Sequence, residues 1–563
     1  MAKTVAIGVQ SFSDLIEGNY FYIDKTDFIR EWWESGDSVT LIARPRRFGK
    51  TLNMSMLEQF FSVDYADRGD LFEGLSIWKD EKYRELQGTY PVISLSFARI
   101  KENDYRKTKA KIREILTNLY SRFYFLRDSE VLTDKDREYF DRISMDMEET
   151  DATSALYQLS DFLYRYYGKK VIILLDEYDT PMQEAYVNGF WDELVAFTRS
   201  LFNSTFKTNP YLARAVMTGI TRVSKESIFS DLNNLEVVTT TSDKYATAFG
   251  FTEEEVFCAM EEYGYGGQKD DVKRWYDGFV FGSQSDIYNP WSILNFLDKG
   301  DIGTYWANSS SNSLVGKLIR EGSKRIKTSF EALMQGEAIQ CPLDEQIIYN
   351  QLDGNEGAVW SLLLASGYLK ILHHESENSV MGGVLPKYEL ALTNYEVKRM
   401  FEYMVHGWFD GLDGSYNDFV EALLLGDTDA MNEYMNRVTD EIFSNFDTGK
   451  KPSKSQPERF YHGFVLGLMV DLNGEYIVTS NRESGFGRYD VMVEPRDKAK
   501  DAFILEFKVF NSRKETSLEE TLQSALAQIK EKNYAASLMA KGIPAEHIRE
   551  YGFAFEGKKV LIG

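Results

Sequence analysis

The stretch that decides the fold of the first part of the chain is Val39-Thr-Leu-Ile-Ala-Arg-Pro-Arg-Arg-Phe-Gly-Lys-Thr51, followed by a helical pattern over residues 51–61. A short apolar strand that ends in a turn and opens a helix is the context of a phosphate-binding P-loop. There, main-chain N–H groups hold phosphates, Lys50 reaches the β- and γ-phosphates, and the Thr51 hydroxyl ligates Mg²⁺. The candidate nucleotide-binding residues of the turn are Arg44, Arg46, Arg47, Phe48, Gly49, Lys50 and Thr51. Arg44 stands where the first glycine is usual, and a chance Gly-Lys-Thr in a basic turn is the alternative.

A second element agrees with this interpretation. Val171-Ile-Ile-Leu-Leu-Asp-Glu177 is an apolar strand that ends in two adjacent carboxylates. Asp176 is placed to hold the Mg²⁺ hydration shell, and Glu177 to polarise water against a γ-phosphate, with Asp179 as the next candidate base. The alternative is a buried strand that exits into a charged turn. The two elements, in this order, predict an ATPase or GTPase site.

A third strand, over residues 213–218, leads into Thr218-Gly-Ile-Thr-Arg222. Thr218 is a candidate sensor of the γ-phosphate, and Arg222 is a candidate phosphate contact. A capped strand end and a surface arginine explain the same residues equally well.

The order of elements predicts an α/β fold class. Strands near 39–43, 91–96, 171–175 and 213–218 alternate with helical patterns, which indicates a P-loop core with a mainly parallel sheet. A mostly helical region follows, and the linker Gly449-Lys-Lys-Pro-Ser-Lys-Ser-Gln-Pro457 leads into a second α/β segment. The expected domains are residues 1–240, 241–448 and 449–563.

The C-terminal segment contains a second candidate site. If residues 488–495 and 502–508 form an antiparallel hairpin about Lys498, then Asp490 lies opposite Glu506, at about 5 Å. Glu506 and Lys508 share one face of their strand because they are two residues apart. Two close carboxylates with a lysine are compatible with a Mg²⁺ or Mn²⁺ site at which the lysine stabilises charge, although spacing alone is more typical of exposed charges on a hairpin. The alternative is a solvated cluster of charges.

Two resemblances extend these predictions. Several short motifs resemble those of a bacterial family of AAA-ATPase-like proteins, and the similarity covers most of residues 5–400. The motifs are RPRRFGKT, ILLDEYDTP, TGITRVSKESIFSDLNN, YIDKT, YDGF and YNPWS. That family implies an ATP-binding core followed by a helical subdomain, and Arg44 is an expected variant of its loop. Residues 455–556 resemble the PD-(D/E)XK nuclease superfamily, with Tyr489 where the motif's name has proline. The second resemblance implies metal ligands Asp490 and Glu506, a catalytic Lys508, a supporting Gln528 and an additional ligand Glu458.

Composition limits the functional classes. The chain has 563 residues, with 64 Lys and Arg against 88 Asp and Glu, so its net charge is 64 − 88 = −24. Such a charge repels polyanions and argues against constitutive, sequence-blind nucleic-acid binding. Two distant cysteines, no signal-like N-terminus and no membrane-length apolar run predict a cytoplasmic protein with no membrane partner.

Two functions remain open at this point. The first is a nuclease that ATP powers or gates, with nucleic acid, DNA or RNA, as its partner. The second is a non-cleaving signalling or scaffold ATPase whose C-terminal domain only binds a partner. The AAA-type resemblance is also compatible with a homo-oligomer.

Overall fold

The computed structural model groups the chain into two compact units. The first comprises Met1–Ser311 and Gly336–Val397, and the second comprises Asn312–Gln335 and Lys398–Gly563. The residues described are 2–221, 228–229, 232–306, 313–343, 352, 355–374, 387–407, 416–446, 464, 467–468, 470–480, 483–484, 487–488, 490–557 and 559–563. The chain therefore passes between the units three times. The three-domain division stays a prediction, and residues 241–448 are shared between the units.

The first unit is built on a parallel sheet. Its strand order is β2-β3-β4-β1-β5. The strands are β1 (Val39–Ala43), β2 (Val92–Ser96), β3 (Val171–Asp176), β4 (Leu212–Gly219) and β5 (Leu235–Val238). Every residue of β1 and β3 is buried, as expected for parallel strands that helices cover on both faces. The predicted parallel sheet is thus observed. The candidate P-loop follows β1, and the two carboxylates lie at the end of β3.

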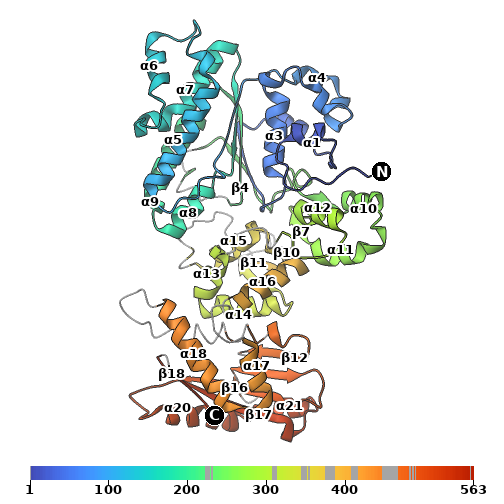
Figure 1. Ribbon diagram of the computed structural model, residues 1–563, viewed down its shortest axis with the longest axis vertical. Coiled ribbons are helices and arrows are strands. Elements are labelled where there is room, and N and C mark those ends of the chain that lie inside the picture. Colours follow the sequence, from blue (N-terminus) through green and yellow to red (C-terminus); the bar gives the residue numbers. More distant parts are fainter. Residues whose placement is uncertain are drawn as a thin grey trace, which may run out of the picture. The chain divides into compact units, whose positions relative to one another are not determined.

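Helices cover both faces of this sheet. The helices are α1 (Phe12–Glu17), α2 (Asp27–Ser35), α3 (Lys50–Phe61), α4 (Glu81–Leu86), α5 (Tyr105–Arg122), α6 (Asp134–Arg142), α7 (Glu149–Tyr167), α8 (Thr180–Asn188) and α9 (Trp191–Phe206). Figure 1 shows α5, α7 and α9 on one side of the sheet and α1 and α3 on the other. The helix expected over 51–61 is α3, which begins at Lys50 after Gly49 in the left-handed conformation, with φ 79°.

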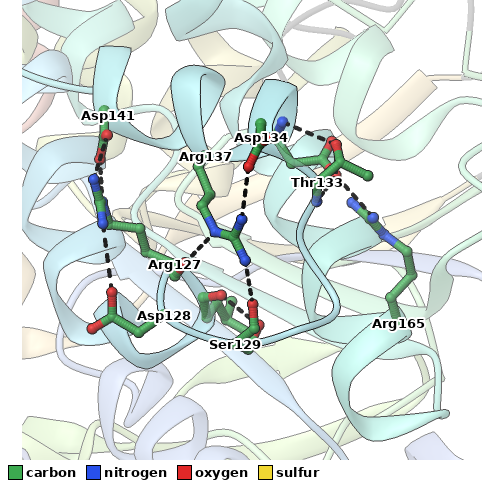
Figure 2. Close-up of polar contacts among 10 residues, drawn as sticks. Arg127, Asp128, Ser129, Thr133, Asp134, Arg137, Asp141 and Arg165 are labelled. Carbon is green, nitrogen blue, oxygen red and sulfur yellow. Dashed lines mark hydrogen bonds and ion pairs between the residues drawn. The ribbon is translucent and has the colours of Figure 1, made fainter.

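Arginine side chains organise the segment between α5 and α7 (Figure 2). Arg127 forms two hydrogen bonds to Asp141, at 2.6 and 2.9 Å. Arg137 donates to the carbonyl oxygens of Arg127 and Ser129 and to Asp134. Exposed ion pairs of this kind contribute little stability, so their effect is to define the path of the chain into α6.

The remainder of the first unit contains two small sheets with helices around them. Its helices are α10 (Glu253–Glu262), α11 (Lys269–Tyr276), α12 (Pro290–Lys299) and α15 (Glu356–Ala365). The strand order is β6-β8-β7 in one sheet and β10-β11-β9 in the other. These strands are β6 (Phe251–Thr252), β7 (Phe279–Phe281), β8 (Gln284–Tyr288), β9 (Ile339–Pro342), β10 (Leu369–His374) and β11 (Lys387–Leu392). The middle of the chain, expected to be mostly helical, therefore also contains strands.

The second unit is built on a mixed sheet of order β12-β15-β16-β17-β18. Its strands are β12 (Tyr476–Ser480), β15 (Val491–Pro495), β16 (Ala502–Val509), β17 (Ile548–Glu556) and β18 (Lys559–Ile562), and a short hairpin joins β13 (Glu483–Ser484) to β14 (Gly487–Arg488). Only β16 and β17 pair in parallel, with α20 (Leu518–Lys532) between them. The helical segment after β16 divides at Asn533, which adopts φ 50°, so that α21 (Ala535–Ala540) is separate from α20. Strand β18 was not predicted.

Helices from outside the C-terminal segment complete the second unit. They are α13 (Ser313–Glu321), α14 (Lys324–Met334), α16 (Tyr395–Gly407), α17 (Tyr416–Leu425) and α18 (Thr428–Phe446). Residues on or next to two of them, α14 and α18, contact the edge strands of this sheet. The Asn432 and Asn436 amides on α18 each exchange two hydrogen bonds with the main chain of β18, at Ile562 and Val560, over 2.7–2.9 Å. After α14, Gln335 donates to the carbonyl of Val478 in β12 at 2.9 Å. Exposed strand edges pair readily with other chains, so these amides protect the sheet.

Candidate nucleotide and metal sites

The carboxyl ends of three parallel strands bring the predicted nucleotide-site residues together. Thr51, in the first turn of α3, donates a hydrogen bond to Asp176 Oδ2 at 2.8 Å. Thr218, near the end of β4, donates to the other oxygen of the same carboxylate. Burial raises the pKa of Asp176, and the two hydroxyl hydrogen bonds oppose that rise. A hydroxyl and a carboxylate in contact are suitable oxygen ligands for Mg²⁺.

Lys50 is buried at the start of α3. Its Nζ donates to the carbonyl oxygens of Arg44 and Pro45, at 3.0 and 2.9 Å. Burial lowers the pKa of Lys50, and the carboxylates of Glu177 and Asp176 oppose that change. The ammonium thus lies inside the turn and close to acidic groups.

Glu177 has an unusual backbone conformation, with φ 49°. A non-glycine residue in the left-handed region is uncommon and is often found at functional sites. The Glu177 N–H donates to the Thr218 hydroxyl at 3.2 Å, and its carboxylate accepts from the Thr180 hydroxyl at 3.0 Å. The carboxylate is therefore held at the carboxyl edge of the sheet.

Arg44 has a role that the sequence did not indicate. Its side chain is fully buried and donates to the carbonyl oxygens of Thr239 and Lys244. The guanidinium carbon lies 4.4 Å from the ring centroid of Phe281, and burial lowers the pKa of Arg44 to about 9. This side chain, a candidate nucleotide contact, anchors the turn to residues 239–244, because carbonyl oxygens of Thr239 and Lys244 accept its hydrogen bonds.

The other side chains of the turn also contact the protein. Arg46 donates to Gln183 Oε1 on α8 at 3.1 Å. The Arg47 guanidinium lies over Trp291, 4.2 Å from the ring centroid. Phe48 is buried against Phe279 and Phe281 at centroid distances of 4.8 and 5.4 Å. Residues of the YDGF and YNPWS motifs therefore pack against the turn. The sequence did not predict these contacts, because the motifs are distant from the turn along the chain.

Asp179 is a supporting residue whose place here the sequence did not reveal. It is 1% exposed, and its Oδ2 accepts from the N–H groups of Ile220 and Thr221 at 2.9 Å each. Burial raises its pKa, and the hydrogen bonds from Thr221 and Ile220 oppose this. Asp179 thus fixes the segment after β4 next to the end of β3. An acidic residue three positions after Asp176 was the only available signal.

The hairpin register of the second unit is the predicted one. Val491 pairs with Leu505, and Met492 with Ile504, so one further step sets Asp490 opposite Glu506. Asp490 Oδ2 also accepts a hydrogen bond from the Phe507 N–H at 2.9 Å. Two carboxylates meet at this end of the hairpin.

Glu506 is a buried carboxyl group whose pKa is raised by its surroundings. It is 3% exposed, and Oε1 accepts from the amide of Gln528 on α20. Within the described part of the chain, its buried Oε2 has no hydrogen-bond partner. Burial, and then the nearby Asp490, raise the pKa of Glu506 to about 8. A divalent cation would compensate both carboxylates, so the donor set fits Mg²⁺ or Mn²⁺.

Lys508 and Gln528 complete this cluster. Lys508 Nζ donates to the Ser524 hydroxyl of α20 at 3.1 Å. Glu506 and Lys508 both contact α20, as expected of residues two apart on one strand. Arg222, Glu458 and Tyr489 lie outside the described residues.

Comparison with known proteins identifies a domain family for each of two parts of the chain. A family described as predicted AAA-ATPase matches residues 6–229, and the PD-(D/E)XK nuclease superfamily matches residues 456–563. The chain thus carries an AAA-ATPase-like domain over residues 6–229, followed by a nuclease-superfamily domain over residues 456–563.

A curated relative extends the comparison beyond the two domains. The chain is 26% identical over 398 residues to a protein of Azotobacter chroococcum mcd 1, described as an uncharacterized protein in the vnfD 5′ region. The alignment covers 70% of this chain and 68% of the relative. Across the described residues, no helix combines the length and apolar character needed to span a bilayer.

Proposed function

We propose that this protein binds and hydrolyses ATP in its first unit and that nucleotide state controls metal-dependent cleavage of nucleic-acid phosphodiesters in its second. The observation that carries the cleavage proposal is the pair Asp490 and Glu506, one step beyond the Val491–Leu505 pair, with one buried Glu506 oxygen that has no hydrogen-bond partner among the described residues. The two matched families supply the class of each reaction.

In the ATP site, the turn from Arg44 to Thr51 acts as a P-loop. Lys50 exchanges the carbonyls of Arg44 and Pro45 for phosphate oxygens, which are stronger acceptors because they are charged. Thr51 and Asp176 would hold Mg²⁺, which would neutralise phosphate charge. Glu177 orients the attacking water, and Thr218 orients Asp176.

In the nuclease site, Asp490 and Glu506 hold Mg²⁺ or Mn²⁺. A cation held there would supply Lewis-acid chemistry, since it would polarise the phosphodiester and lower the pKa of a bound water. Lys508 places a positive charge beside the carboxylates and stabilises the charge that develops on the phosphate. Gln528 orients Glu506 through the hydrogen bond to Oε1.

The second candidate function is a signalling or scaffold ATPase whose C-terminal domain binds a partner without cleaving it. The observation that favours it is the net charge of −24, which opposes the approach of a polyanion.

The deciding experiment incubates the full chain with single-stranded DNA, double-stranded DNA and RNA, with Mg²⁺ or Mn²⁺, and with or without ATP. Glu506→Gln is the matched control, because it retains the shape of the side chain and removes the ligand charge. Cleavage by the parent that the variant lacks supports the nuclease. If the parent releases no product from any substrate with either metal, the scaffold function replaces it.

A further inference from the structure

We infer that Trp306 and Glu396 are positioning residues of the candidate phosphate-binding turn, and that through them its nucleotide state reaches the second unit. This inference rests on the proposed function, since it assigns regulation to the same ATP site. Neither residue belongs to the span of either matched family, residues 6–229 and 456–563.

Trp306 holds the main chain of the turn. Its indole Nε1–H donates to the carbonyl oxygen of Arg46 at 3.0 Å, and the Asn289 amide approaches the same oxygen at 3.4 Å. Trp306 is 2% exposed and packs against Phe279 and Tyr368, with 5.5 Å between its ring centroid and each of theirs. Because the indole is buried against two rings and bonded to the Arg46 carbonyl, movement of the Arg46 peptide requires movement of Trp306 or loss of its hydrogen bond.

Glu396 holds Trp306 in turn. It is 1% exposed, and its Oε1 accepts from the N–H groups of Tyr305 and Trp306 at 2.6 and 2.7 Å. Its Oε2 accepts from the Ser292 hydroxyl at 2.8 Å. These hydrogen bonds stabilise the buried carboxylate, which makes the arrangement stiff.

Trp306 and Glu396 lie close in sequence to points where the chain passes into the second unit, and for this reason we assign their contacts a regulatory role. Trp306 comes six residues before Asn312, where the chain enters the second unit (312 − 306 = 6). Glu396 lies in the first turn of α16, and this helix continues from the first unit into the second after Val397. One carboxylate therefore joins two of the three chain passages to the peptide of the phosphate-binding turn.

ATP binding would change the forces on that peptide. Lys50 is bonded to the carbonyls of Arg44 and Pro45, next to the Arg46 carbonyl that Trp306 holds. Transfer of Lys50 to phosphate alters the turn on one side while Trp306 restrains it on the other. A ligand shifts a conformational equilibrium only by its difference in affinity for the two states. ATP would have such a difference, because Lys50 and Trp306 bond to successive carbonyls of the same main-chain segment, residues 44–46.

The first measurement is ATP affinity. Trp306→Phe removes the N–H donor and retains an aromatic ring, so affinity should fall about three- to tenfold, the loss expected for one hydrogen bond. Trp78→Phe is the matched control, because Trp78 belongs to the same unit and stacks on Phe72, 6.0 Å between centroids. Glu396→Ala should reproduce the loss. Glu396→Gln should restore affinity because it retains an acceptor for the two N–H groups.

The second measurement is the ratio of cleavage rates with saturating ATP and without ATP, which a purely structural defect would not change. The ratio should approach one in Trp306→Phe and Glu396→Ala and match the parent in Glu396→Gln and Trp78→Phe. If the parent binds ATP and Trp306→Phe has the parental ATP affinity and the parental ratio of cleavage rates, this inference is overturned and the proposed function is not. A parent that binds no ATP overturns the ATPase proposal and this inference with it. If Glu396→Ala does not fold, Trp306→Phe and Glu396→Gln still decide.

Discussion

Asp490 lies opposite Glu506 across the β15–β16 hairpin, one step beyond the Val491–Leu505 pair. The pair is asymmetric, because Asp490 accepts a main-chain hydrogen bond from Phe507 while Glu506 keeps a buried oxygen without a partner among the described residues. Burial and the neighbouring charge together make Glu506 a weak acid. This asymmetry leads to the first two predictions.

Replacing either carboxylate should abolish cleavage that depends on Mg²⁺ or Mn²⁺, because both are needed to hold the ion. Asp490→Asn and Glu506→Gln are expected to lose product formation in a gel assay and to lose metal binding in calorimetry. Glu494→Gln is the matched control on β15, since Glu494 pairs with Lys541. Parental cleavage by Glu506→Gln would contradict the metal site.

Metal binding should release a proton below pH 8. The pKa of Glu506 is raised to about 8 without a cation, so this carboxyl is protonated at pH 7 and must ionise to bind the ion. Affinity for Mg²⁺ should therefore rise from pH 6.5 to pH 8 and then level off. Calorimetry at pH 7 in two buffers of different ionisation enthalpy measures the proton, and identical apparent enthalpies would refute its release.

Removing the ammonium of the turn should weaken nucleotide binding. Lys50→Ala removes a charge-assisted contact to phosphate, worth about 1.5–3 kcal/mol. Titration with ATP measures the loss, and Lys79→Ala, an exposed lysine of the same unit, should bind ATP as the parent does. Unchanged affinity in Lys50→Ala would place nucleotide elsewhere.

Hydrolysis should depend on Glu177. Glu177→Gln retains the hydrogen bond from Thr180 but cannot polarise water, so ATP should stay bound while turnover falls by about 10²–10⁴. Phosphate release under saturating ATP is the measurement. A variant with parental turnover would transfer the role of base to another group, with Asp179 the nearest alternative in sequence.

The C-terminal nuclease segment should require α18. Asn436→Ala removes two hydrogen bonds to Val560, with an expected cost of about 1–3 kcal/mol to the unfolding of the second unit. A fragment of residues 450–563 lacks both asparagines and should self-associate through β18. Size-exclusion chromatography tests the fragment, and denaturation followed by a probe in the second unit tests the variant. A monomeric, folded fragment would show that the edge needs no cover.

The sequence by itself determined the local features of both sites. The apolar strand before Gly49-Lys50-Thr51 and the apolar strand before Asp176 are short-range patterns, and their order is enough to predict a parallel sheet with a site at its carboxyl edge. The hairpin register follows from equal distances to Lys498, because side chains on paired strands alternate with a fixed period.

Only the tertiary structure decided what holds these sites in place. The Arg44 side chain points to Thr239 and Lys244, Trp306 bonds to Arg46 from 260 residues away, and Asn436 completes β18. The weak acidity of Glu506 likewise depends on burial against α20. Each depends on how distant segments pack, and no local period encodes it, because a buried polar group takes whichever partner the completed fold brings within hydrogen-bonding distance.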